Sequence, residues 1–179
     1  MHLGFVLVLI YLLYPARATG SKHKLAWYDV LLAAAGAAVC GYIVWNYDVI
    51  VLDAGPPTEM DFIFGCASIL LVLEATRRIV GLPITLVAVC FLLYAKFGNL
   101  IPGMMGHPGF SMKRIVAHMY LTTEGLFGMP LGVSASFVFL FILFGAFLHS
   151  TGLGKFFIDL ALAAAGRFVG GPAKVAVLA

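Results

Sequence analysis

The chain has 179 residues, of which 63% are hydrophobic and 11% are charged, whereas ordinary soluble domains have about 45–50% and about 25%. A soluble domain of this length has too little interior to hide so much apolar surface, so lipid must be the solvent for much of the chain. The net charge of +3 is small and scattered, which argues against a nucleic-acid-binding role.

The first apolar run covers residues 1–16 and carries no charge. Ala16-Arg17-Ala18 mimics the cleavage site of a secretory signal, but no Lys or Arg precedes the run and the basic residues follow it. This order of charges favours a membrane helix over a signal peptide. Because the run begins at the first residue, we expect the chain to be a fragment with neighbours upstream.

Four further stretches predict membrane helices, at 30–47, 60–76, 79–95 and 131–149. Each approaches the roughly 17–25 residues that cross the hydrocarbon core. Aromatic residues flank the first of these stretches as an interfacial belt, namely Trp27, Tyr28, Trp45 and Tyr47. With the first run, the predicted fold is an all-α polytopic transmembrane helical bundle of about five spans.

Residues 154–168 follow a different pattern. Apolar residues recur at helical spacing and charged residues interrupt them, which predicts an amphipathic helix at the membrane interface or an arm between spans. Gly170, Gly171 and Pro172 end this helix. Residues 173–179 then begin a further apolar helix, so we also expect the chain to continue beyond Ala179.

The charges of the connections predict a topology. Residues 15–26 carry bases and no acid, residues 46–61 carry acids and no base, and Arg77 and Arg78 follow. Because short loops rich in Lys and Arg stay cytoplasmic, alternation places 15–26, 77–78 and 151–174 inside and 46–61 and 96–124 outside. The long connection at 96–124 fits least well, since it carries Lys96, Lys113 and Arg114.

The stretch "LEATRRIVGLP" at 73–83 contains the most conspicuous charges. Glu74 precedes Arg77 and Arg78 by three and four residues, so one helix face can hold all three. One interpretation is an ion pair at a cytoplasmic helix end, followed by a turn at Gly81 and Pro83. The other is a charged contact at a subunit seam or an ion path, because intramembrane acids are often functional.

No motif for catalysis or for a metal emerges elsewhere. Cys40, Cys66 and Cys90 stand alone in different apolar runs, which predicts plain thiols. Surface or interfacial roles are expected for His107, His118, Glu124 and His149, and backbone or helix–helix hydrogen bonds for Ser134 and Ser136. The sequence also lacks the common phosphate-binding and hydrolytic motifs. We therefore expect neither an enzyme nor a bound cofactor.

Three strings carry a family resemblance: 73–83, "YLTTEGLFGMPLGVSASFVFLFILFGAFL" at 120–148 and "GKFFIDLALAAAGRFVGGPAKVAVLA" at 154–179. They resemble the fused permease of tripartite ATP-independent periplasmic (TRAP) transporters. The TAXI-type subclass, in which the small and large membrane subunits form one polypeptide, is the most similar. Residues 27–61 resemble the segment that precedes these strings in such fusions.

This resemblance implies a multi-pass bacterial inner-membrane symporter. It would import an organic anion, usually a carboxylate, with a sodium gradient and a periplasmic binding protein of the TAXI type. Sodium would be the coupling ion, and its ligands and those of the substrate are expected beyond Ala179. The resemblance implies small-subunit-like helices at 1–80 and the start of the large permease at 81–179, with the join somewhere within 55–82.

Two alternatives belong to other classes of protein. An accessory membrane subunit would scaffold another permease and carry nothing itself. A membrane-embedded enzyme would use His118 and Glu124 as acid and base, but a six-residue offset on one helix separates their faces. If the chain belongs to such a transporter, we expect Gly170-Gly171-Pro172 to act as a bend between the scaffold and the moving domain of the transporter.

Overall fold

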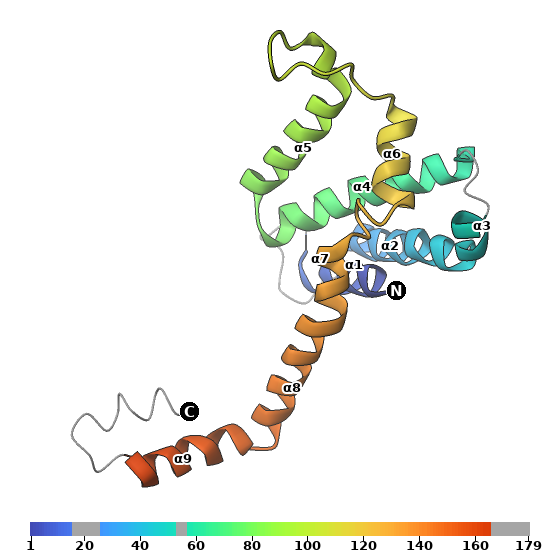
Figure 1. Ribbon diagram of the computed structural model, residues 1–179. Coiled ribbons are helices and arrows are strands. Elements are labelled where there is room, and N and C mark those ends of the chain that lie inside the picture. The colour runs from blue at the N-terminus through green and yellow to red at the C-terminus, as the bar shows by residue number, and fades with distance from the viewer. Residues whose placement is uncertain (16–25, 53–56, 166–179) are drawn as a thin grey trace. The chain divides into compact units, whose positions relative to one another are not determined.

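The computed structural model describes residues 1–15, 26–52 and 57–165, and the regular structure in these ranges is entirely helical (Figure 1). The described residues divide into two compact units, Met1–Leu131 and Gly132 onward. The elements in chain order are α1 (His2–Leu13), α2 (Trp27–Trp45), α3 (Tyr47–Leu52), α4 (Glu59–Ile79), α5 (Leu82–Phe97), η1 (Gly98–Leu100), α6 (Met112–Leu121), α7 (Met129–Val133), η2 (Ser134–Val138), α8 (Phe139–Ser150) and α9 (Leu153–Ala165).

The first unit is built on α1, α2 and α4, which share one hydrophobic core. Small residues bring α1 and α2 together, since a Cβ added to Gly4 would lie 2.8 Å from the Cβ of Cys40. Such close approach is how membrane helices gain packing energy without a hydrophobic driving force. The core residues buried among these helices and α6 are Leu7, Tyr11, Ala33, Val39, Leu71, Ala75 and Tyr120.

Two buried tyrosines add polar links across this core. The Tyr11 hydroxyl on α1 donates to the backbone oxygen of Leu71 on α4 at 2.6 Å. The Tyr120 hydroxyl on α6 donates to the backbone oxygen of Val39 on α2 at 2.7 Å. Each buried hydroxyl therefore has a hydrogen-bond acceptor, a backbone oxygen of a neighbouring helix.

The start of α4 is fixed by a capping box. The Thr58 hydroxyl accepts from the Asp61 backbone N–H at 3.2 Å, and the Asp61 carboxylate accepts from the Thr58 N–H at 2.8 Å. Tyr42 on α2 also donates to Asp61, at 2.9 Å. The end of α2 and the start of α4 thus lie together, at the opposite end of these helices from Arg78.

The connection expected at 96–124 contains a helix. Ser111 caps α6, and α6 packs on α4 at Gly65, where an added Cβ would lie 2.4 Å from Val116. The sequence analysis treated 96–124 as a connection between spans and gave no bounds for a helix within it. The buried residues of this helix are Ile115, Val116 and Tyr120.

Within the described residues, three helices have the length and hydropathy to cross a membrane: Trp27–Trp45, Leu82–Leu100 and Met129–Ser150. The expected number of about five spans is therefore not confirmed. Helix α1 is apolar but only 12 residues long, which is less than the roughly 17 residues of a perpendicular span. Helix α4 is 21 residues long but carries acids in its first turn and arginines in its last.

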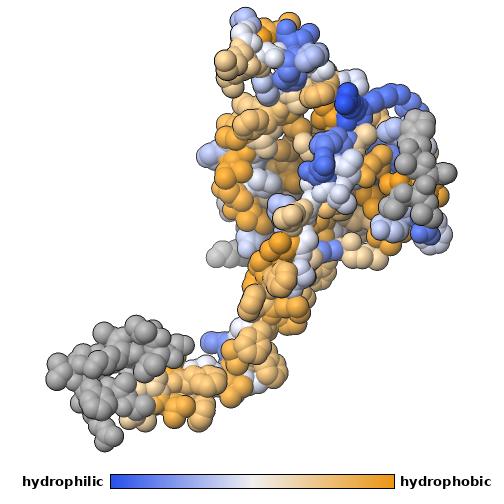
Figure 2. All heavy atoms as spheres, in the orientation of Figure 1, coloured by the Kyte–Doolittle hydropathy of each residue, from blue (hydrophilic) through white to orange (hydrophobic). Residues whose placement is uncertain are grey.

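The helix from Met129 to Ser150 buries none of its residues within the chain. Figure 2 shows hydrophobic side chains along its visible face. Residues Ser134–Val138 form a π-helical turn within it, and Ser136 donates to the Gly132 backbone oxygen at 2.7 Å. A helix so apolar on every side requires lipid or further protein around it.

The helix expected over 154–168 is present as α9, which begins after Gly152 with φ of 74°. Arg167 lies outside the described residues. In the first unit, α4, α5 and α6 pack together with α1 and α2, so packing does not divide the chain near residue 80. The expected division at 80/81 stays a prediction.

The contact at Gly65 generates a prediction. We expect Gly65→Leu to lower the melting temperature of the detergent-purified protein, because overpacking a close helix contact costs about 1–3 kcal/mol. Gly41→Leu on α2 is the matched control, since an added Cβ there meets nothing within 4 Å. Equal melting temperatures for the two variants would show that the α4–α6 contact does not depend on a small residue.

Candidate functional site

The charges of 73–83 form a cluster at the end of α4. The Glu74 carboxylate accepts from Arg77 Nε and Nη2, both at 2.7 Å, and from Arg78 Nε at 2.9 Å. The spacing of three and four residues places both guanidinium groups over the same turn of the helix. Both arginines also lie in the last turn, where positive charge suits the helix dipole.

Arg78 extends the cluster to two other helices. Its Nη1 donates to Asp29 Oδ1 on α2 at 2.8 Å and to the backbone oxygen of Tyr14, just after α1, at 2.9 Å. Its guanidinium also lies over the ring of Tyr11, 4.7 Å from the centroid. One side chain therefore joins the end of α1, the start of α2 and the end of α4.

Burial divides the cluster into an inner and an outer pair. The side chains of Arg78 and Asp29 are 2% and 0% exposed, whereas those of Arg77 and Glu74 are 38% and 29% exposed. Taking two charges out of water is costly unless their geometry is good and further hydrogen bonds satisfy them. Arg78 meets this condition through its bonds to Glu74 and Tyr14, while Asp29 Oδ2 has no hydrogen-bond partner among the described residues.

The turn after the cluster depends on Gly81 and Pro83. Gly81 has φ of 103°, a conformation that side chains disfavour, and its N–H donates to the Thr76 backbone oxygen at 3.2 Å. Pro83 lies in the first turn of α5, where a missing N–H costs nothing. The two residues stop α4 and start α5 directly beside the charges.

Sequence reasoning brought Glu74, Arg77 and Arg78 together but missed Asp29. Asp29 begins the span that follows the basic connection at 15–26, and loop alternation assigns that connection to the same side as 77–78. An acid at this depth was therefore a candidate partner for the arginines. Gly170, Gly171 and Pro172 lie outside the described residues.

The arrangement of His118 and Glu124 corrects one step of the sequence reasoning. Helix α6 ends at Leu121, so the two residues do not share one helix, and the following turn brings Glu124 back. His118 Nε2 and Glu124 Oε2 lie 3.9 Å apart with both side chains exposed. This separation exceeds the roughly 2.6–3.2 Å that direct proton transfer requires.

His107 has partners within its own loop and on α5. His107 Nδ1 accepts from the Gly109 N–H at 3.0 Å, and His107 Nε2 lies 3.1 Å from the Tyr94 backbone oxygen. His107 therefore holds the loop after α5 in place. No group of three or more His, Cys, Asp or Glu residues suited to a metal occurs in the part of the chain that the structure describes.

The inner pair generates a prediction about stability. Arg78→Gln leaves Asp29 buried without its ion pair, and breaking such a pair costs about 3–5 kcal/mol. Arg77→Gln is the matched control, because a half-exposed pair contributes about 0–1 kcal/mol. Denaturation of the purified variants measures both losses, and equal losses would show that burial does not distinguish the two arginines.

Comparison with known families places these residues in context. Residues 67–179 match the family described as "Tripartite ATP-independent periplasmic transporter, DctM component". No curated protein and no solved structure matches the chain. The match begins within α4 and includes Glu74, Arg77 and Arg78, whereas Asp29 precedes it.

The matched segment covers more than half of the chain and contains α5, the helix Met129–Ser150 and α9. The DctM component family is a family of transporters and not of enzymes. The exposed side chains of His118 and Glu124, with 3.9 Å between Nε2 and Oε2, are consistent with this. The chain is thus a membrane component of a TRAP transporter and belongs to the DctM component family.

Proposed function

We propose that this chain forms part of a permease that imports an organic anion of the carboxylate class into a bacterial cell across its inner membrane. The observation that carries the proposal is the family match over residues 67–179, which coincides with two apolar helices long enough to span a membrane. A sodium gradient drives the uptake, and a periplasmic binding protein of the TAXI type delivers the substrate.

The N-terminal helices support the proposal of a fused permease. Residues 1–66 lie outside the family match, yet α1 and α2 pack with α4 in one unit, and Arg78 bonds to both of them. We propose that these helices correspond to the small membrane subunit, with the join to the large subunit within 55–82. The start of the match at residue 67 falls within this range.

The buried Arg78–Asp29 pair then has a defined role in the permease. It fixes the helices that precede the match against the first matched helix, so the two parts form one scaffold. No residue in this chain is assigned to the substrate or to sodium. The alternative of an accessory subunit predicts the same packing but no transport.

Transport by reconstituted protein tests the proposal. We expect proteoliposomes to accumulate substrate only when an inward sodium gradient and the cognate binding protein are both present. A proton gradient of equal size, imposed without sodium, is the control for the coupling ion. Uptake that needs neither the binding protein nor sodium would overturn the proposal, and absence of uptake under all conditions would favour the accessory subunit.

The proposed orientation has its own test. In a variant with Cys40, Cys66 and Cys90 replaced by alanine, we expect Met104→Cys to react with a membrane-impermeant maleimide added to intact spheroplasts. Val80→Cys should react only after permeabilisation, because the loop charges place it inside. Both positions are exposed in the structure, so labelling in the opposite order would reverse the topology.

A further inference from the structure

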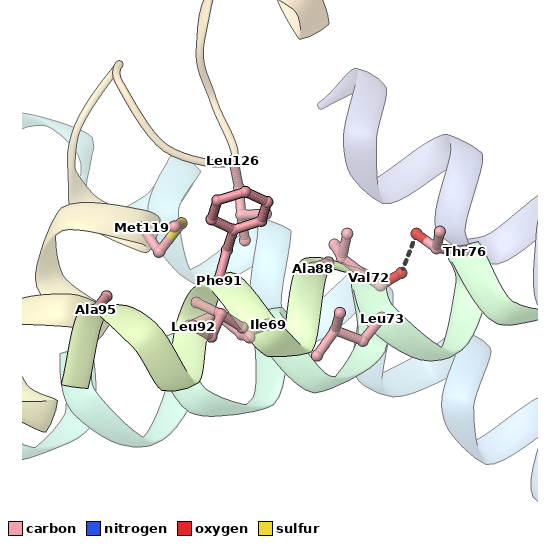
Figure 3. A pocket seen from close by; sticks show the side chains of 10 residues that line it. All are labelled: Ile69, Val72, Leu73, Thr76, Ala88, Phe91, Leu92, Ala95, Met119 and Leu126. Atoms are coloured by element: carbon pink, nitrogen blue, oxygen red, sulfur yellow. Dashed lines mark hydrogen bonds between the residues drawn. The ribbon is translucent and has the colours of Figure 1, made fainter. Parts of the chain in front are cut away.

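Two adjoining cavities between α4, α5 and α6 have no part in the ionic cluster. The first has a volume of about 300 Å³ and is wholly apolar apart from Thr76, whose hydroxyl donates to the Val72 backbone oxygen at 2.8 Å (Figure 3). In Figure 3, Ala95 and Met119 lie at one end of this cavity and Thr76 at the other. Its walls come from α4 and α5 and include Ile69, Val72, Leu73, Ala88, Phe91 and Leu92.

The second cavity has a volume of about 430 Å³ and is a neighbour of the first, since Ala95 and Met119 line both. Its lining changes from apolar to polar on α6, where Arg114, His118 and Thr122 contribute. We call these two neighbouring cavities together the groove, which has an apolar end and a cationic end. Both volumes fall within or near the roughly 300–1,000 Å³ of ligand pockets.

Arg114 is the cation that this groove leaves without a counter-charge. No carboxylate lies within 4 Å of it among the described residues, and its guanidinium stacks over Phe110 at 5.1 Å. The neighbouring Lys113 is different, because it pairs with Glu59 at 2.6 Å. His118 lies 3.9 Å from Glu124, so Arg114 supplies the positive charge at the mouth of the groove.

We propose that this groove binds a membrane phospholipid, with its phosphate at Arg114 and one acyl chain between α4 and α5. A planar guanidinium presents paired donors that match phosphate oxygens. Apolar cavities exclude water, and α5 is one of the helices with the length and hydropathy of a membrane span. Phospholipid combines the required phosphate and apolar chain in one molecule and surrounds such a span.

The dimensions of the groove favour a lipid chain over a further helix of the transporter. From Ala88 to Ala95 the groove follows seven residues of α5, or about 10 Å at the helical rise per residue. A helix with its side chains is about 10–12 Å across, so a cavity of 300 Å³ cannot hold one. The part of a single extended acyl chain nearest the headgroup fits this shape and brings the phosphate to the cationic end.

Photo-crosslinking tests the apolar end. The purified full-length protein is reconstituted with phosphatidylglycerol that carries a diazirine in its acyl chain, and adducts are mapped by mass spectrometry of peptides. We expect adducts on the α4 and α5 residues that line the groove. Ala88→Phe should remove most of them, whereas Ala38→Phe, on an exposed face of α2 away from the groove, should not.

The smaller Ala95→Leu is a second variant, chosen in case Ala88→Phe does not fold, and it should reduce the adducts where the two cavities meet. Adducts on the groove that neither variant reduces, or an absence of adducts there while other surfaces are labelled, would overturn the proposal. Cross-links from the groove to another segment of the transporter would show that protein fills it instead.

Retention of phosphatidylglycerol in native mass spectrometry tests the cationic end. We expect Arg114→Gln to lower the retained lipid on the order of tenfold, which is the loss that one charge-assisted hydrogen bond implies. Lys113→Gln is the matched control, because Lys113 pairs with Glu59 outside the groove. Equal retention by both variants would contradict a phosphate site at Arg114. These readouts do not depend on transport, so they are separate from the test of the proposed function.

Discussion

The buried contact between Arg78 and Asp29 is the interaction on which the first unit depends. Apolar packing alone allows helices to slide or rotate, because contacts between apolar surfaces are not directional. A buried ion pair tolerates no such shift, since displacement leaves both charges without partners. Arg78 bonds to Asp29, Glu74 and the Tyr14 backbone oxygen, and it thereby sets the positions of three helix ends relative to one another.

The cluster and the groove use charge in different ways. In the cluster, two carboxylates lie against two guanidinium groups, so the positive and negative charges balance within the chain. At the groove, Arg114 has no carboxylate nearby among the described residues and lies at the open end of an apolar cavity. The first arrangement serves packing, and the second is suited to a ligand that carries a phosphate.

Sequence patterns predicted the helical class and several elements well. The amphipathic helix expected at 154–168 is present as α9 through Ala165, and Gly81 with Pro83 forms the expected turn. The patterns did not delimit α6, which packs on Gly65 within a segment expected only to connect two spans. The expected number of about five spans is not confirmed, since α1 has only 12 residues and α4 carries charged residues in its first and last turns.

The sequence by itself determined that lipid surrounds much of the chain, that the fold is all-α, and how the charges are spaced along α4. Composition shows that much of the chain needs lipid, and the spacing of Glu74, Arg77 and Arg78 makes their pairing a local property of one helix. Only the tertiary structure decided that Asp29, 49 residues from Arg78 along the chain, closes the cluster. Such a partner depends on how α2 packs against α4, and no local period in the sequence encodes that contact.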